Sequence, residues 1–297
     1  MSADRRNETM RTDGGVVADV WHATVQSPRL QLQRVLHIAG MEYRLAVRGR
    51  WALGLTTVFA LFGVGLATFS GADVAPAGYE RTVASLAALA VYLVPLAALA
   101  FGFDTIVGRE ESGWLHALFA LPLARSRVVL GLFLGRVVVF AGATIIGFGI
   151  AGGLLLREFG FAGWPTFVWF VLAAVGAGVA FLSIAVLVST VTSEKTHALG
   201  VVLAAWAWFV LIYDLLALGI IAAFRLPESA ITALVLGNPA GIFRVLVLDM
   251  LETGGSGGYA AAFATTGIAP SVLVLGLTAW IVIPLAIAVR LVRRRSL

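Results

Sequence analysis

Residues 104–127, DTIVGREESGWLHALFALPLARSR, decide how the rest of the chain can be arranged. This stretch carries six formal charges between two long apolar runs. A charged side chain at the centre of hydrocarbon costs about 2.5–3.5 kcal/mol on insertion scales, so we expect the stretch to lie in water. Leu115, Leu118 and Leu121 recur at helical spacing, and Pro122 ends the pattern. The sequence predicts a short amphipathic helix at the membrane surface, which either rests on its own bundle or offers its apolar stripe to a partner.

The composition indicates an integral membrane protein. Of the 297 residues, 60% are hydrophobic and 12% are charged, whereas charged residues make up about 25% of a typical soluble domain. The mean hydropathy is +0.96. Cysteine is absent, so neither a disulfide nor a thiolate metal site can form.

Six apolar segments are each close to the ~20 residues that cross ~30 Å of hydrocarbon. They are residues 51–70, 82–103, 128–156, 165–191, 198–223 and 268–289. With the amino terminus in the cytoplasm, 17 of the 21 basic residues fall on the cytoplasmic side. Basic residues concentrate on that side in membrane proteins. We therefore expect a multi-pass protein of the plasma or inner membrane with both termini in the cytoplasm.

Two segments precede the first span. Residues 1–28 are polar, and we expect them to form a mobile cytoplasmic arm without a cleavable signal peptide. Residues 29–50 combine apolar residues at three- and four-residue steps with several arginines. This pattern predicts a helix in the membrane interface, with its apolar side toward lipid and its arginines toward anionic headgroups. We expect no nucleic-acid binding by this basic helix, because a membrane span adjoins it.

Glycine pairs in the third segment predict close helix packing. Gly131 and Gly135 are four residues apart, and Gly149 and Gly153 repeat that spacing. Small residues at this spacing let the backbones of two helices approach each other.

The connection before the last span has its own pattern. Residues 229–252, SAITALVLGNPAGIFRVLVLDMLE, hold two apolar runs broken at Gly237, Asn238 and Pro239. Each run is too short to cross a bilayer, so we predict two re-entrant or interfacial half-helices on the outer face.

Asp214 is an ionisable residue within the fifth span, with Tyr213 beside it. A carboxyl group there is costly unless it is protonated or paired, so it is expected to face the bundle interior or a water-filled cavity. Two interpretations remain open. Asp214 either makes a hydrogen bond between helices or forms part of a pathway or gate.

The sequence excludes several kinds of chemistry. The single lysine, Lys195, lies in Ser-Glu-Lys-Thr without a preceding glycine-rich turn, so the chain has no P-loop. No histidine, methionine or cysteine lies within a predicted span, so a soft-ligand pathway for copper through the bundle has no donors. We therefore predict that the chain is not an enzyme and binds no metal or cofactor of its own.

One motif resembles a known family. Residues 108–113, Gly-Arg-Glu-Glu-Ser-Gly, with the leucines and proline that follow, resemble the coupling region after the second span of ABC-2 exporter permeases. This resemblance implies a homodimer that contacts a separate cytoplasmic ABC ATPase, to which ATP and magnesium bind. It implies that residues 29–297 form one all-α domain with six transmembrane helices, an amino-terminal interfacial helix, a cytoplasmic coupling helix and outer half-helices. The coupling residues would be Arg109, Glu110, Gly113, Leu115, Leu118 and Pro122.

A second resemblance is narrower. The run HALGVVLAAWAWFVLIYDLLALGII from His197, with Asn238-Pro239 and Phe243-Arg244, resembles the permease of Nos-type ABC systems. It implies a role in nitrous oxide reductase maturation, through sulfur supply or copper handling, with an accessory protein at the outer face and membrane lipid around the bundle. The candidate pathway or outer gate comprises Tyr213, Asp214, Asn238, Pro239 and Arg244. Two alternatives remain, namely an ABC-2 permease for a lipid or small toxic molecule and a membrane scaffold that moves nothing.

Overall fold

The computed structural model describes residues 28–70, 76–114, 124–224, 226–250 and 267–294. Every regular element in these ranges is a helix. Six helical segments are long and apolar enough to cross a membrane, namely Trp51–Phe69, Gly78–Glu111, Arg125–Phe159, Trp164–Val191, Lys195–Ala223 and Pro270–Arg294. Each coincides with one predicted span, so the six-span prediction is confirmed. The amino-terminal arm lies outside the described residues, except for residue 28.

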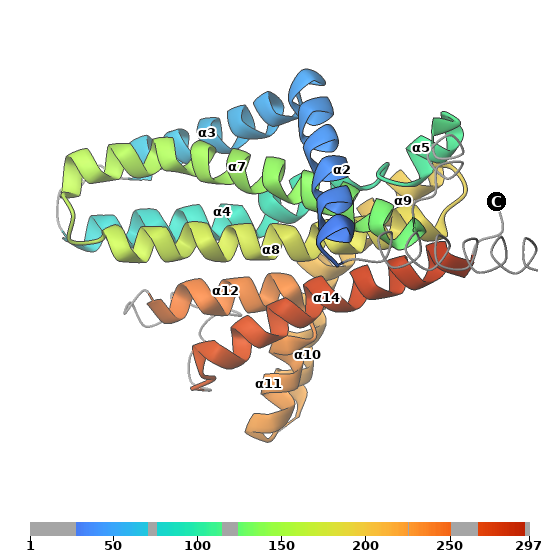
Figure 1. Ribbon diagram of the computed structural model, residues 1–297. Coiled ribbons are helices and arrows are strands. Elements are labelled where there is room, and N and C mark those ends of the chain that lie inside the picture. Colours follow the sequence, from blue (N-terminus) through green and yellow to red (C-terminus); the bar gives the residue numbers. More distant parts are fainter. Residues whose placement is uncertain (1–27, 71–75, 115–123, 225, 251–266, 295–297) are drawn as a thin grey trace, which may run out of the picture.

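Four long helices form the body of the molecule, and a fifth crosses them (Figure 1). The long helices are α3 (Trp51–Ser70), α4 (Pro76–Gly102), α7 (Arg125–Phe159) and α8 (Trp164–Val191). The helix α2 (Pro28–Arg48) precedes them and lies across α7. Gly160, with φ +71°, ends α7, and Pro165 begins α8 within its first turn, so the turn between these two helices is short.

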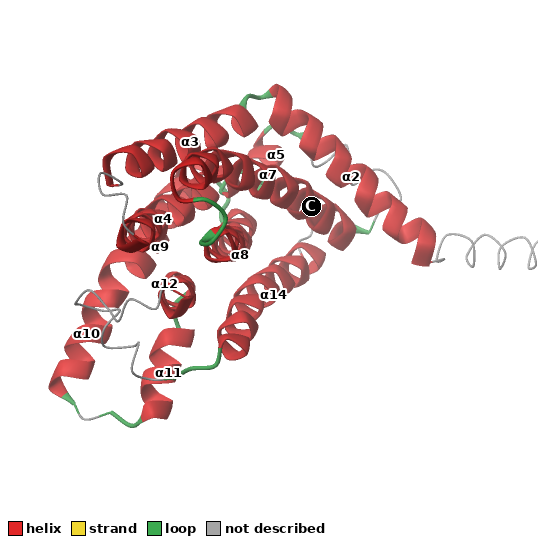
Figure 2. Cartoon of the chain, turned by 90° about the vertical axis from the view of Figure 1, so that its left-hand side faces the viewer, coloured by secondary structure: helices red, strands yellow, loops and turns green. Residues whose placement is uncertain are grey.

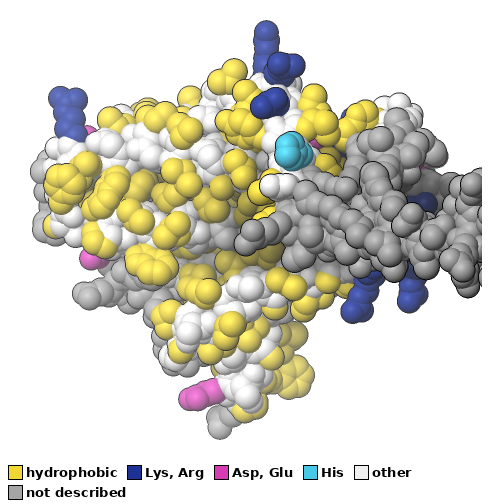
Figure 3. All heavy atoms as spheres, in the orientation of Figure 1, with side chains coloured by type: hydrophobic (Ala, Val, Ile, Leu, Met, Phe, Trp, Pro, Cys, Tyr) yellow, Lys and Arg dark blue, Asp and Glu magenta, His cyan; other side chains and the backbone are white. Residues whose placement is uncertain are grey.

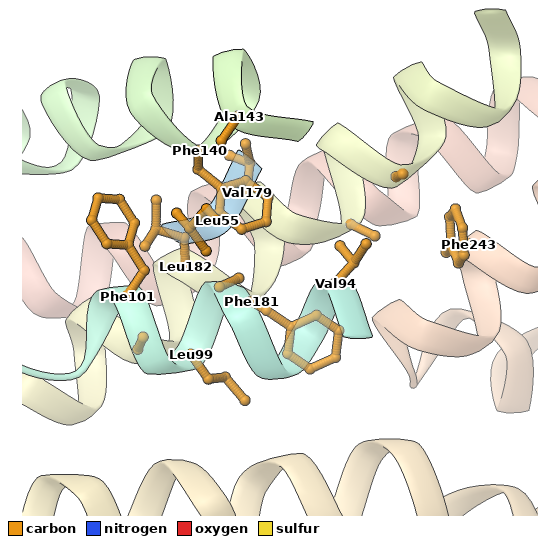
Figure 4. Packing of buried hydrophobic residues seen from close by; sticks show 14 of the residues in the cluster. Leu55, Val94, Leu99, Phe101, Phe140, Ala143, Val179, Phe181, Leu182 and Phe243 are labelled. Carbon is orange, nitrogen blue, oxygen red and sulfur yellow. The ribbon is translucent and has the colours of Figure 1, made fainter. Parts of the chain in front are cut away.

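The helix α8 lies at the centre of the packing. In the most apolar stretch of α8, 72% of the residues are buried, whereas in the corresponding stretch of the fifth span only 17% are buried. Phe181 and Leu182 of α8 are fully buried, and Phe140 of α7 and Leu99 of α4 pack in the same cluster (Figure 4). Because α8 is apolar on all sides, it has no polar face to turn toward water.

Glycine permits the crossing of α2 over α7. A Cβ at Gly131 would lie 2.7 Å from the Cβ of Ile38, and one at Gly135 would lie 2.5 Å from the Cβ of Glu42. Both separations are too short for real carbon atoms, so close packing at the first glycine pair is confirmed. At Gly149 and Gly153 an added Cβ would meet no described atom within 4 Å. Among the described residues, the same prediction is therefore wrong for the second pair.

The apolar side of α2 is divided between two surroundings. Val35, Ile38 and Ala46 are buried, whereas Leu32 and Leu36 are 60% and 56% exposed. The helix thus packs one stripe against the bundle and leaves another stripe uncovered in this chain. The predicted helix exists with nearly the predicted bounds, and its contact with lipid remains a prediction.

The carboxyl-terminal half of the fifth span and the first half-helix extend away from this body, whereas the second half-helix packs against α8 and α4 (Figures 1 and 2). The fifth span comprises α9 (Lys195–Ala207), the π-helix η1 (Trp208–Ile212) and α10 (Tyr213–Ala223). The half-helices α11 (Glu228–Leu236) and α12 (Pro239–Met250) meet at an angle of 112°, which confirms the break predicted at Gly237 to Pro239. The last helix, α14 (Pro270–Arg294), packs on α8. In the view of Figure 3 hydrophobic side chains cover much of the described surface, with Lys and Arg at its margins.

Candidate functional site

The polar connection between α4 and α7 begins with an anchored turn. The backbone N–H groups of Ile106 and Val107 both donate to Ser189 Oγ of α8, at 2.9 and 3.1 Å. Ser189, Ile106 and Val107 are buried. The short helix α5 (Val107–Glu111) follows directly, so its first turn is fixed to the central helix of the bundle.

A network of charged side chains surrounds this anchor. Glu42 of α2 contacts two arginines, pairing with Arg109 of α5 through Oε2 and with Arg136 of α7 through Oε1, the latter at 2.9 Å. Arg136 also pairs with Asp104 at 2.9 Å and donates to the carbonyl of Phe101 at the end of α4. Glu42 and Arg136 are 2% and 6% exposed. Charges buried to this degree are tolerated when they are paired and hydrogen-bonded.

The network reaches the start of the fifth span. Lys195 Nζ lies 3.5 Å from Asp104 Oδ2, and the backbone N–H of Lys195 donates to Glu111 Oε1 at 2.7 Å. Both Lys195 and Glu111 are exposed, so these contacts contribute less than the buried ones. Together the contacts join α2, the end of α4, α5, α7 and α9 at one end of the bundle.

The structure describes three of the six predicted coupling residues. Arg109 points into the network, where its side chain is 15% exposed and donates to the carbonyl of Thr105 at 2.6 Å. Glu110 is partly buried in α5. Gly113 is exposed with φ +72°, a backbone conformation that favours glycine. Leu115, Leu118 and Pro122 lie outside the described residues, as does most of the predicted amphipathic helix.

The residues predicted to form an outer gate assemble into one cluster. Arg244 Nη1 of α12 lies 2.5 Å from Asp214 Oδ2, and Asn238 Nδ2 lies 3.3 Å from Asp214 Oδ1. Asn238 Nδ2 also donates at 2.8 Å to the carbonyl of Phe209, which belongs to η1. π-Helical turns are frequent at functional sites, since they change the direction of nearby side chains and carbonyls. The Asp214 carboxylate thus faces α12 across the bend between the half-helices.

Asn238 and Pro239 also build that bend. The Asn238 side chain accepts a hydrogen bond from the N–H of Ala240 at 3.0 Å and so caps α12, with Pro239 at its first position. Tyr213 donates to the carbonyl of Leu234 at 2.8 Å, near the end of α11. The sequence placed Tyr213, Asp214, Asn238, Pro239 and Arg244 in one candidate site, and the structure brings them together.

Comparison with known proteins identifies the family. A family model described as "ABC-2 family transporter protein" matches residues 36–297. The chain belongs to this family. Two relatives are each named "Probable ABC transporter permease protein NosY". The one from Pseudomonas aeruginosa is 35% identical over 277 residues, covering 88% of this chain and 98% of the relative, and the one from Stutzerimonas stutzeri is 36% identical over 275 residues, covering 89% and 99%.

The chain is therefore an ABC-2 permease and a multi-pass membrane protein. Among the described residues of this permease, no three His, Asp or Glu side chains gather closely enough to hold a metal ion. Glu42 and Arg136 were not among the site residues predicted from the sequence. Arg136 falls inside the third apolar segment, and that position was a signal that it needs a partner. Glu42 follows Ile38 and precedes Ala46 by four residues each, and its place on this apolar stripe of α2 was a similar signal.

Proposed function

We propose that this ABC-2 permease is the membrane subunit of a transporter in which a separate cytoplasmic ATPase binds ATP and magnesium. In this proposal, ATP hydrolysis drives export or a conformational signal at the outer face. The observation that supports it most directly is the anchoring of the turn before α5 to Ser189 of α8. A partner that grips the segment after α5 can then displace the central helix, because the segment begins at a fixed point rather than in a loose loop.

In this proposal the predicted coupling residues of the permease make the contact with the ATPase. Leu115 and Leu118 fill an apolar cleft of the ATPase, Glu110 accepts hydrogen bonds or pairs with a basic residue, and Gly113 permits close approach. Burying one leucine side chain contributes about 1.5–3 kcal/mol. In this proposal Pro122 would end the contact helix that the sequence predicts before α7 begins.

We further propose a role in nitrous oxide reductase maturation, through a sulfur species or copper handling. The similarity to two relatives named NosY along most of their length supports this assignment. The working assembly contains two copies of the permease and two copies of the ATPase. An accessory protein binds it at the outer face. The distribution of basic residues supports an inner-membrane location with both termini in the cytoplasm.

The Asp214 cluster serves as the outer gate in this proposal. Its charged pair joins the fifth span to α12, and the half-helices bend at Asn238 between them. A gate needs two alternative arrangements of packed elements. Opening would separate Arg244 from Asp214 and move α12 relative to the fifth span.

Purification of the tagged full chain from its native membranes tests the proposal. We expect an ATPase with a P-loop to co-purify in equal amount, in a particle that contains two copies of each subunit. A strain without this gene should make nitrous oxide reductase that lacks its copper centres, and the intact gene should restore them. Normal copper centres in that strain would favour another cargo, and failure to recover any ATPase would favour a scaffold that moves nothing.

A further inference from the structure

Glu42 places a buried negative charge of α2 between positive charges of two other elements. Its two carboxylate oxygens pair with Arg109 of α5 and Arg136 of α7, so one side chain connects three helices. The side chain of Glu42 is 3% exposed and that of Arg136 is 8% exposed. If α2 moved away alone, the largely buried Arg109 would lose this carboxylate and Arg136 would keep only Asp104 as a charged partner, and loss of pairing by charges this far from water is unfavourable.

Steric fit holds α2 at the same position. The close approach at Gly131 and Gly135 brings the α2 backbone against α7, with the Ala39 carbonyl 2.7 Å from a Cβ built at Gly135. Glu42 lies at this crossing, because its Cβ is 2.5 Å from the same Cβ built at Gly135. The charge contact and the backbone contact therefore act at one point of α2 rather than at separate ends.

The corner between α2 and α3 is held by backbone hydrogen bonds. Gly49 donates to the Leu45 carbonyl at 2.8 Å, Arg50 donates to the Val47 carbonyl at 3.2 Å, and Gly54 donates to the Arg50 carbonyl at 2.8 Å. These bonds continue from the last turn of α2 into the first turn of α3. A rotation of α2 is thus passed to α3, because the connection contains no slack segment.

From this arrangement we infer that Glu42 is a positioning residue that makes α2 and the first span move with the coupling segment. The inference rests on the proposed function, since the motion begins where an ATPase grips the segment after Arg109. Through the contact with Ser189, that motion reaches α8. Glu42 extends it to α2 and α3, so α2 acts as a lever rather than as a passive anchor in the membrane interface.

A merely structural ion pair would also be buried, so the test must measure motion. The chain contains no cysteine, and pairs of introduced cysteines can therefore carry spin labels without background. Leu36 of α2 and Leu275 of α14 are 56% and 68% exposed, and Ser112 after α5 is exposed. Leu36 and Leu275 accept labels without disturbing the core, and retained binding of the ATPase shows that a label at Ser112 leaves the proposed contact intact.

The experiment uses the full permease bound to its ATPase in nanodiscs, with and without ATP and vanadate. We expect the distance between labels at Leu36 and Leu275 to shift on vanadate trapping, while the distribution of distances between labels at Leu36 and Ser112 stays narrow and unchanged. Glu42→Gln should abolish the Leu36–Leu275 shift and broaden the Leu36–Ser112 distribution. It should also reduce permease-stimulated ATP turnover at least fivefold. Glu158→Gln, at an exposed carboxylate near the other end of α7, should leave all three readouts unchanged.

Glu42→Gln leaves excess positive charge in the network, so Glu42→Gln with Arg109→Gln serves as the second variant. It restores the charge balance and should fold, yet still lose the shift because the ionic link is gone. A Leu36–Leu275 distance that does not change in the unaltered, active complex would overturn the lever and leave the coupling proposal standing. A normal shift in either Glu42 variant would likewise overturn it. If the unaltered permease binds no ATPase, both proposals fail.

Discussion

Asp214 in the fifth span and Arg244 in α12, 30 positions apart in the sequence, form an ion pair in which Oδ2 and Nη1 are separated by 2.5 Å. The side chains are 13% and 17% exposed. The pair joins the fifth span, which has few buried residues, to a half-helix that packs on α8. It therefore limits how far these two elements can separate.

Asp214→Asn should destabilise the permease by about 2 kcal/mol, less than the ~3–5 kcal/mol typical of fully buried pairs because both side chains retain some exposure. The variant removes the negative partner and keeps Arg244 in place. Asp214→Asn with Arg244→Gln should recover part of this loss, because no charge remains without its counterion. Thermal unfolding midpoints in detergent measure both effects, and equal destabilisation of the single and double variants would argue against the pair.

The same substitution distinguishes gating from packing. If the pair forms the outer gate, Asp214→Asn should lower maturation of the target enzyme even where the folded protein reaches the membrane in normal amount. Unchanged maturation with a lower unfolding midpoint would leave Asp214 as a packing residue.

The sequence predicted the spans because hydrophobicity over ~20 residues depends on composition and not on partners. It also predicted the half-helix break, since Gly237, Asn238 and Pro239 interrupt helical periodicity locally. Resemblance to a family grouped Asp214 with Asn238 and Arg244, and the structure supplied the contacts.

The charged network was not predictable in the same way. Glu42 and Arg136 are separated by 94 residues, and nothing in either local pattern identifies the other as its partner. Gly149 and Gly153 form a local pattern that predicts a helix contact, but the described residues show no such contact there. Their spacing resembles that of Gly131 and Gly135, but which glycine pair meets another helix depends on the rotation of α7 within the bundle.

Glycine substitutions test the α2 crossing. Gly135→Val should destabilise the permease by at least ~1–3 kcal/mol, the usual cost of overpacking, because its side chain would collide with Glu42 and the Ala39 carbonyl. Gly149→Val is the matched control on the same helix, where an added Cβ meets no described atom. Unfolding midpoints of the two variants should differ clearly, and similar midpoints would contradict the packing described for α2.

Copper should not cross the bundle as a bare ion. No cysteine exists in the chain, and the described residues hold no cluster of His, Asp and Glu suited to a metal. Vesicles containing the permease and its ATPase should therefore accumulate no copper on addition of ATP, compared with vesicles containing the ATPase alone. Robust ATP-dependent copper uptake by the purified pair would refute this expectation.

If the segment after Arg109 carries the ATPase contact, as proposed, Leu118→Asp should break that contact. The change removes apolar burial worth about 1.5–3 kcal/mol and introduces a carboxylate that must be desolvated. The spans should still insert, because residue 118 lies between the second and third of them. Leu118→Met, which keeps volume and hydrophobicity, is the control.

The decisive measurement is co-purification of the two subunits, together with permease-stimulated ATP turnover in nanodiscs. Leu118→Asp should lose both the bound ATPase and the stimulation, whereas Leu118→Met should retain them. If the ATPase stays bound to the Leu118→Asp permease and is fully stimulated by it, this segment is not the coupling element.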